Sequence, residues 1–128
     1  MKYLDDSALP EMSDEEFQEL RQSARPYTVL VLKAGPEFVM PGPGRDPRVL
    51  GIIMEHGKRN VRLKLAGLMP IVCPIADGSG MTGIGLFDAS PEDVERIMAE
   101  DPGVKAGVFT YEVHPCRSFP GSALPVSD

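Results

Sequence analysis

One short segment constrains the fold more than any other part of the sequence, namely residues 27–33, YTVLVLK. β-Branched and aromatic residues are typical of a strand, and the side chains of a strand alternate between its two faces. Val29 and Val31 therefore lie on one face, and Leu30 and Leu32 lie on the other. Both faces are apolar, so a sheet that contains this strand needs cover on both sides, although the sequence does not show which pair meets which cover.

Helices and strands are expected to alternate after this segment. Asp46 before Pro47 is typical of a helix N-terminus, where a side-chain oxygen caps the first turn, and the same pattern recurs at Ser90 and Pro91. Residues 68–75 are apolar but contain two prolines, which is typical of an edge strand because proline donates no ladder hydrogen bond. The expected elements are, in order, a strand at 27–33, a helix from 46 to 67, strands at 68–75 and 84–88, a helix from 90 to 100 and a strand at 108–114.

This order, β-α-β-β-α-β, predicts an α+β domain of the ferredoxin-like class, in which an antiparallel sheet carries both helices on one face. A chain of 128 residues is long enough to form one such domain with a substantial core. The opposite face of the sheet would still expose apolar side chains of residues 27–33, and large apolar patches rarely stay exposed in monomers. We therefore expect a second copy of the chain to cover this face, in a homodimer or a higher oligomer.

The chain divides into three regions by composition. Residues 1–26 form an acidic N-terminal extension with a short helix that begins after Ser13, residues 27–116 form the ferredoxin-like domain, and residues 117–128 form a tail. The net charge of −6 and the absence of Trp argue against nucleic-acid binding, which depends on basic phosphate contacts. No apolar run approaches the roughly 20 residues of a membrane span, and the N-terminal residues lack an apolar signal core, so we expect no membrane partner and a cytoplasmic location.

His56 is the strongest candidate for a functional side chain. It follows Ile53 by three residues and so lies beside the apolar stripe of the helix predicted at 46–67. By itself, such a residue is most simply a hydrogen-bonded core histidine. Acid or base chemistry requires a partner that orients the ring through its second nitrogen. Asp101, at the chain reversal before Pro102, fits that role, and it fits equally well as a helix N-cap.

Other polar residues give weaker indications of a site. Residues 78–83 match the glycine pattern GxGxxG, but they precede a strand, whereas a dinucleotide site follows one, so a turn is expected. Ser79 in this turn and Lys33 at the end of the first strand are candidates for substrate binding, and Arg59 is expected on a solvated helix face. The two cysteines and two histidines form no zinc pattern, so we predict neither a metal nor another cofactor.

Two stretches resemble the YciI-like (YCII-related) protein family. Residues 101–115, DPGVKAGVFTYEVHP, are similar to the C-terminal signature of that family, and residues 56–68 are similar to its histidine-bearing helix and the exit from it. The resemblance extends over residues 27–116. It implies a ferredoxin-like fold assembled as a dimeric α/β barrel, with a cavity centred on a histidine and an aspartate that correspond to His56 and Asp101.

Two functions from different classes stay open. In the first, the chain is an enzyme without a cofactor, in which His56 and Asp101 are the catalytic pair. His56 transfers a proton to or from a small cyclic or carboxylated metabolite, and Asp101 fixes its tautomer, as in an isomerase, a lyase or a dehydrohalogenase. In the second, the same cavity binds a small-molecule ligand without turnover, as in a metabolite-binding protein or a pathway accessory protein.

Overall fold

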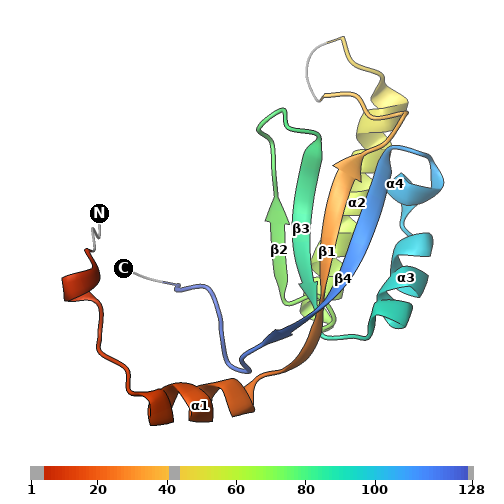
Figure 1. Ribbon diagram of the computed structural model, residues 1–128. Helices are drawn as coiled ribbons and strands as arrows, with labels where there is room; N and C mark the ends of the chain where they lie inside the picture. The colour runs from red at the N-terminus through yellow and green to blue at the C-terminus, as the bar shows by residue number, and fades with distance from the viewer. Residues whose placement is uncertain (1–4, 41–43, 127–128) are drawn as a thin grey trace.

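Four antiparallel strands form one sheet in the computed structural model, which describes residues 5–40 and 44–126 (Figure 1). The strands lie in the order β2-β3-β1-β4, so that β2 and β4 are the edges. This architecture is α+β, and it is compatible with the ferredoxin-like class predicted from the sequence. The strands are β1 (Arg25–Ala34), β2 (Ile71–Pro74), β3 (Met81–Phe87) and β4 (Phe109–Ser118).

The helices begin where the sequence predicts capping residues. The Asp46 side chain accepts a hydrogen bond from the backbone N–H of Arg48 at 2.9 Å. Ser90 caps its helix in the same way, through the N–H of Asp93 at 3.2 Å. Such caps satisfy backbone donors that lack a partner inside the helix. The helical elements are η1 (Asp6–Ala8, a 3-10 turn), α1 (Asp14–Ser23), α2 (Pro47–Leu65), α3 (Pro91–Ala99) and α4 (Pro102–Lys105).

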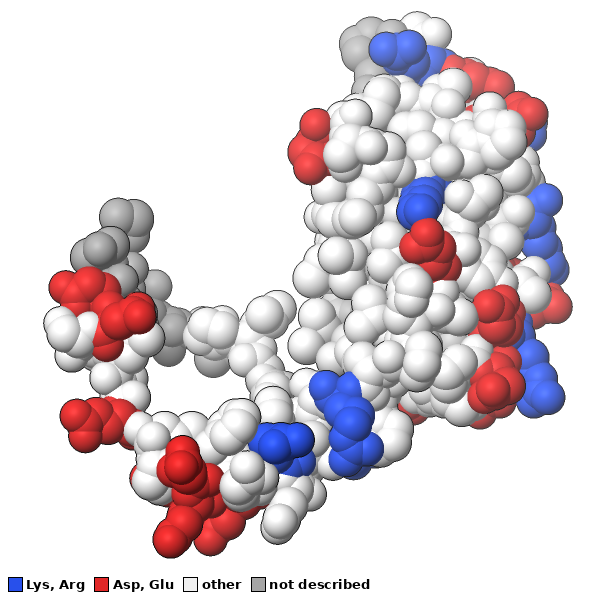
Figure 2. All heavy atoms as spheres, viewed as in Figure 1, with Lys and Arg blue, Asp and Glu red and all other residues white. Residues whose placement is uncertain are grey.

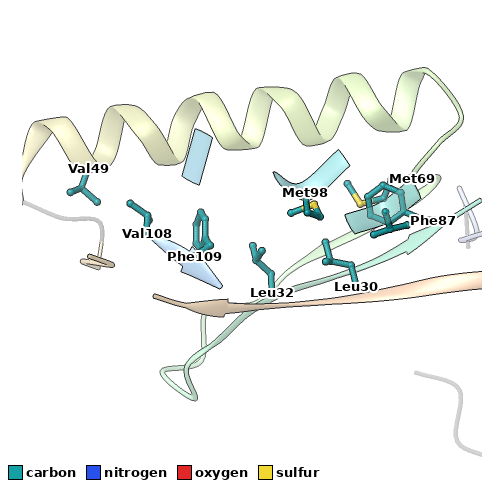
Figure 3. Packing of buried hydrophobic residues seen from close by; sticks show 9 residues of the cluster. Leu30, Leu32, Val49, Met69, Phe87, Met98, Val108 and Phe109 are labelled. Carbon is teal, nitrogen blue, oxygen red and sulfur yellow. The ribbon is translucent and has the colours of Figure 1, made fainter. Parts of the chain in front are cut away.

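The core lies between the sheet and α2 (Figure 3), and α3 adds the buried side chains of Val94 and Met98. Leu30 and Leu32 of β1 point toward α2 and are only 4% and 5% exposed. Val29 and Val31 therefore face the other side of the sheet, which decides the assignment that the sequence left open. The buried apolar side chains of the core are Leu30, Leu32, Val49, Met69, Phe87, Val94, Met98, Val108 and Phe109.

The side of the sheet that faces away from α2 and α3 is here called the open face. Apolar side chains of β1 and β3 pair across it, with Val31 opposite Ile84 and Val29 opposite Leu86. Ile84 is 38% exposed. Figure 2 shows this side of the molecule as largely uncharged. The open face therefore presents an apolar surface on β1 and β3, as the alternation in residues 27–33 predicts, and the ion pair of Lys33 with Glu112 borders it.

Three strands, β1, β3 and β4, are longer than the sequence predicts, and β2 is shorter. β3 begins at Met81 instead of 84, and β4 continues to Ser118 instead of 114, because β1 pairs with both along its length. Arg25 pairs with Ser118, so β1 and β4 extend two residues beyond the predicted domain limits at 27 and 116. A separate short helix, α4, follows Asp101, where only an interruption was expected. The residue at which a strand ends depends on the strands that pair with it. The pattern of residues along one segment does not show these pairing partners.

The N-terminal extension forms an arm that stands away from the sheet (Figure 1). The arm comprises residues 5–24 and includes η1 and α1. A capping box begins α1, as predicted, because Ser13 and Glu16 each accept a hydrogen bond from the backbone N–H of the other. No residue of α1 is buried, and Phe17 is 47% exposed. Residues 1–4 and 127–128 of the predicted extension and tail lie outside the described residues.

The burial of Leu30 predicts a large cost for its truncation. We expect Leu30→Ala to lower the free energy of unfolding by about 2–5 kcal/mol, because it leaves a cavity between β1 and α2. Leu124→Ala makes the same chemical change at a side chain that is 67% exposed, and it should stay within about 0.5 kcal/mol of the parent. Urea unfolding followed by circular dichroism measures both. Equal losses in the two variants would contradict the assignment of Leu30 to the core.

Candidate functional site

Asp101 lies fully buried at the N-terminus of α4, where its carboxylate caps the helix. Its Oδ2 atom accepts hydrogen bonds from the backbone N–H groups of Gly103 at 2.9 Å and Val104 at 3.1 Å. A Cβ atom at position 103 would lie 2.4 Å from the ring of Phe109, so this close approach requires glycine. The predicted N-cap role of Asp101 is therefore confirmed, and it holds a carboxylate inside the core.

His56 of α2 meets this carboxylate. Its Nδ1 atom lies 2.8 Å from Oδ1 and 2.9 Å from Oδ2 of Asp101, and its side chain is only 9% exposed. An ionised carboxylate only accepts hydrogen bonds, so Nδ1 carries the hydrogen and donates it. The ring of Phe109 packs against the imidazole, with 4.5 Å between ring centroids. The pairing of His56 with Asp101 is therefore confirmed, and one carboxylate both caps α4 and orients the ring.

Two further residues of α2 complete the group, and the sequence analysis did not identify either. The side-chain Nδ2 of Asn60 donates to Nε2 of His56 at 3.1 Å. Arg59 was expected on a solvated face, but its Nη1 lies 3.7 Å from Asp101 Oδ1 and its Nη2 donates to the carbonyl of Ile97 at 2.7 Å. The available signal was helical spacing, since residues three and four positions after His56 lie on its side of the helix.

Opposing effects act on the protonation of Asp101. Burial raises the pKa of its carboxyl group, because desolvation disfavours the charged form. The hydrogen bond and the charge of His56 lower the pKa, and so do the backbone N–H groups of Val104 and Gly103. The lowering effects prevail, so the pKa of Asp101 lies below its ordinary value of 3.8. Asp101 is therefore a buried carboxylate at neutral pH.

A cavity of about 570 Å³ borders this group of residues. Its lining includes His56 and Asn60 of α2, the core-facing side chains of β1, and residues of β2 and β3. Phe109 closes it beside the imidazole, and the Phe38 ring lies 5.9 Å from that of Phe109. The size is within the roughly 300–1,000 Å³ of small-molecule sites. The arrangement places a fixed imidazole at the wall of a mostly apolar cavity.

The two predicted substrate-binding residues lie apart from this pair. Lys33 of β1 lies on the open face, where it forms an ion pair with Glu112, so the assignment of Lys33 to the site is corrected. Lys33 comes one position after Leu32, whose side chain faces the core, so the Lys33 side chain points to the other side of the sheet and away from the cavity. Ser79 lies in the turn before β3, and its Oγ accepts a hydrogen bond from the N–H of Met81 at 3.3 Å. Its neighbours at 78 and 80 line the cavity, whereas Ser79 is not part of the lining.

The site supplies two potential metal donors, His56 and Asp101. Within residues 5–40 and 44–126, no group of three or more His, Cys, Asp or Glu side chains could hold a metal ion. In the same part of the chain, no helix combines the length and apolar character needed to cross a membrane. Comparison with known proteins found no family model and no curated protein that matches this chain. The resemblance to YciI-like proteins therefore stays a prediction based on residues 27–116.

The lowered pKa of Asp101 predicts a stability that depends on pH. Asp101→Asn should lower the free energy of unfolding at pH 7 by about 1–3 kcal/mol, because it weakens charge-assisted hydrogen bonds in the core. The carboxylate contributes fully to stability above pH 3.8, which is the pKa of this group in the unfolded chain. The contribution is lost as the pH falls through the lower pKa of the folded state. The difference between parent and variant should therefore shrink below pH 3.8.

Urea unfolding at neutral pH and at about pH 3 measures this difference. Asp93→Asn, which removes an exposed carboxylate from α3, is the matched control and should change stability at pH 7 much less. A difference between parent and Asp101→Asn that stays constant down to pH 3 would mean that the charge of Asp101 does not stabilise the fold.

Proposed function

We propose that the chain is an enzyme without an organic cofactor that moves a proton on a small molecule. His56 is the catalytic residue, and Asp101 is a positioning residue that acts through it. One observation carries the proposal: the Nδ1 side of the ring is held by a buried carboxylate at 2.8 Å, while the same ring lines a cavity of about 570 Å³. The implied reaction classes are isomerisation, elimination and dehydrohalogenation. The resemblance to YciI-like proteins, which share a fold with muconolactone isomerase-like enzymes, supports the same classes.

The proton transfer uses the nitrogen that Asp101 leaves free. Nε2 of His56 takes a proton from a C–H group of the substrate, and the electron pair of that bond stays on the substrate. Asp101 stabilises the imidazolium that forms, and the guanidinium of Arg59 lies 3.7 Å from the same carboxylate. Asn60 releases Nε2 to the substrate when the ligand enters. Return of the proton to another atom completes an isomerisation, and departure of a leaving group completes an elimination.

A binding role without turnover is the second candidate, and one observation favours it. Both ring nitrogens of His56 already have partners, since Asp101 takes Nδ1 and Asn60 takes Nε2. A histidine that is satisfied in this way also fits a structural part of a ligand site. Calorimetry that shows binding of a ligand, with no product after long incubation, would support this candidate over the enzyme.

Hydrogen–deuterium exchange tests the enzyme directly. Neutral cyclic ketones and their carboxylated analogues are incubated with the protein in D₂O, and replacement of C–H by C–D is followed by NMR. We expect the protein to speed exchange for part of this panel, and His56→Ala to lower that rate by about 10²–10⁴-fold. Lys33→Ala, on the other side of the sheet, is the matched control and should keep the rate. Exchange that His56→Ala does not slow would refute the role of His56.

We also propose that two copies of the chain pair through their open faces. Val29, Val31 and Ile84 would otherwise remain in contact with water, and a two-fold interface covers the same patch on both copies. The arm supports this proposal, because Phe17 and Leu20 are 47% and 41% exposed on a helix with no buried residue. An isolated helix of this length is marginal in water, so the arm also requires a surface to pack against.

The proposed interface predicts different outcomes for neighbouring positions of β1. Val31→Glu places a charge on the open face and should convert a dimer into a folded monomer, measured by sedimentation and circular dichroism. Leu30→Glu places the charge in the core and should unfold the chain. Val126→Glu, at a fully exposed position, should change neither property. A parent protein that sediments as a monomer at micromolar concentration would contradict the interface.

A further inference from the structure

The cavity beside His56 is nearly free of charge. Among the described residues that line it, none is Lys, Arg, Asp or Glu, and the polar side chains are His56, Asn60, Cys73 and Thr82. Lys33 is paired with Glu112 on the open face, and Arg59 is held between Asp101 and a backbone carbonyl. Neither cation is therefore available to neutralise an anionic group of a ligand in the cavity.

A carboxylated ligand is disfavoured for two reasons. A buried charge without a paired counter-charge loses hydration that the apolar wall does not replace. Among the described residues that line the cavity, the imidazole of His56 is the one side chain that can take up a proton and become a cation. A ligand carboxylate that paired with the imidazolium would hold the ring in its acid form and remove the base that the proposed reaction requires.

Two lining residues carry polar atoms that lack a partner. Asn60 Oδ1 and Thr82 Oγ1 are buried and have no hydrogen-bond partner in the part of the chain that the structure describes. Buried polar atoms are nearly always hydrogen-bonded. A neutral hydroxyl or carbonyl group of a ligand would supply such partners, because the hydroxyl of Thr82 both donates and accepts and Asn60 Oδ1 accepts.

We infer that this site takes an uncharged molecule with an apolar, ring-bearing body and a small hydrogen-bonding group that contacts Asn60 and Thr82. The inference rests on the proposed function for the role of His56. It narrows the substrates that the sequence left open, which were cyclic or carboxylated, to the neutral cyclic class. Apolar burial by side chains such as Leu32, Ile53 and Phe109 supplies the affinity, and the two polar residues orient the ligand.

A pair of probes with the same rings separates neutral from anionic ligands. 2-Naphthol is neutral at pH 7, and 2-naphthoate carries a carboxylate on the same skeleton. Binding to the full chain is measured by calorimetry, and the location by NMR shifts of the His56 ring and the Asn60 side-chain amide. We expect 2-naphthol to bind and to shift both signals, and 2-naphthoate to bind roughly tenfold or more weakly. Equal or tighter binding of 2-naphthoate, or no binding of 2-naphthol at millimolar concentration, would overturn the inference.

A matched pair of variants tests the polar contact. Thr82→Val removes the hydroxyl and keeps the shape, and it should weaken binding of 2-naphthol roughly three- to tenfold. Thr110→Val makes the same change at an exposed position of β4 that pairs with Lys33, and it should leave the affinity unchanged. Equal affinity of Thr82→Val and the parent for 2-naphthol would remove Thr82 from the site.

The same probes distinguish failure of this inference from failure of the proposed function. His56→Ala should still bind 2-naphthol, because the apolar wall supplies most of the contact, while it loses the deuterium exchange. A preference for 2-naphthoate overturns the neutral ligand class and leaves the exchange result standing. Neutral binding without exchange in the parent protein overturns the enzyme and leaves the ligand class standing.

Discussion

The site depends on one buried charge, the carboxylate of Asp101. A charge in a protein interior is stable only when hydrogen bonds and opposite charges replace the water that it has lost. Asp101 obtains these from the backbone N–H groups of Gly103 and Val104, from His56 at 2.8 Å and from Arg59 at 3.7 Å. The same contacts start α4, join it to α2 and set the direction of the imidazole, so the fold and the candidate chemistry share one group.

The cavity follows from the residues that β3 presents to the core. Gly83 pairs with Leu32 and Gly85 pairs with Leu30, and all four line the cavity. Glycines at two successive core-facing positions remove side-chain volume between the sheet and α2. The remaining wall is apolar, so a charged group of a ligand inside the cavity would be poorly solvated. The imidazole of His56, in contrast, is hydrogen-bonded to the carboxylate of Asp101. Packing and electrostatics therefore both favour the neutral, mostly apolar ligand that we infer.

The open face and the arm both leave apolar side chains exposed to water in a single copy of the described chain. Val29 and Val31 face away from the helices, and α1 exposes Phe17 without a buried residue of its own. Both features place apolar surface outside the core, on the sheet and on the arm that extends from its first strand (Figure 1). Pairing of two copies would cover the sheet surface and offer the arm a neighbour, which is why the interface and the arm belong to one proposal.

Local chemistry made much of this fold predictable from the sequence. Capping at Ser13, Asp46 and Ser90 involves residues two or three positions apart, so the helix starts follow from short sequence patterns. The alternation in residues 27–33 likewise determined a strand with two apolar faces. Strand ends were less predictable, because β3 and β4 lengthen to match β1 and pairing is a property of two segments.

The sequence by itself determined that His56 lies on a helix and that Asp101 caps a chain reversal. Only the tertiary structure decided that these two residues, 45 positions apart in the sequence, meet, since no local pattern encodes a long-range contact. The tertiary structure also places Leu30 and Leu32 in the core. Lys33 therefore lies on the open face, away from the cavity. The physical reason is that a strand alternates its side chains without specifying which side is the core, and the packing of α2 and α3 makes that choice.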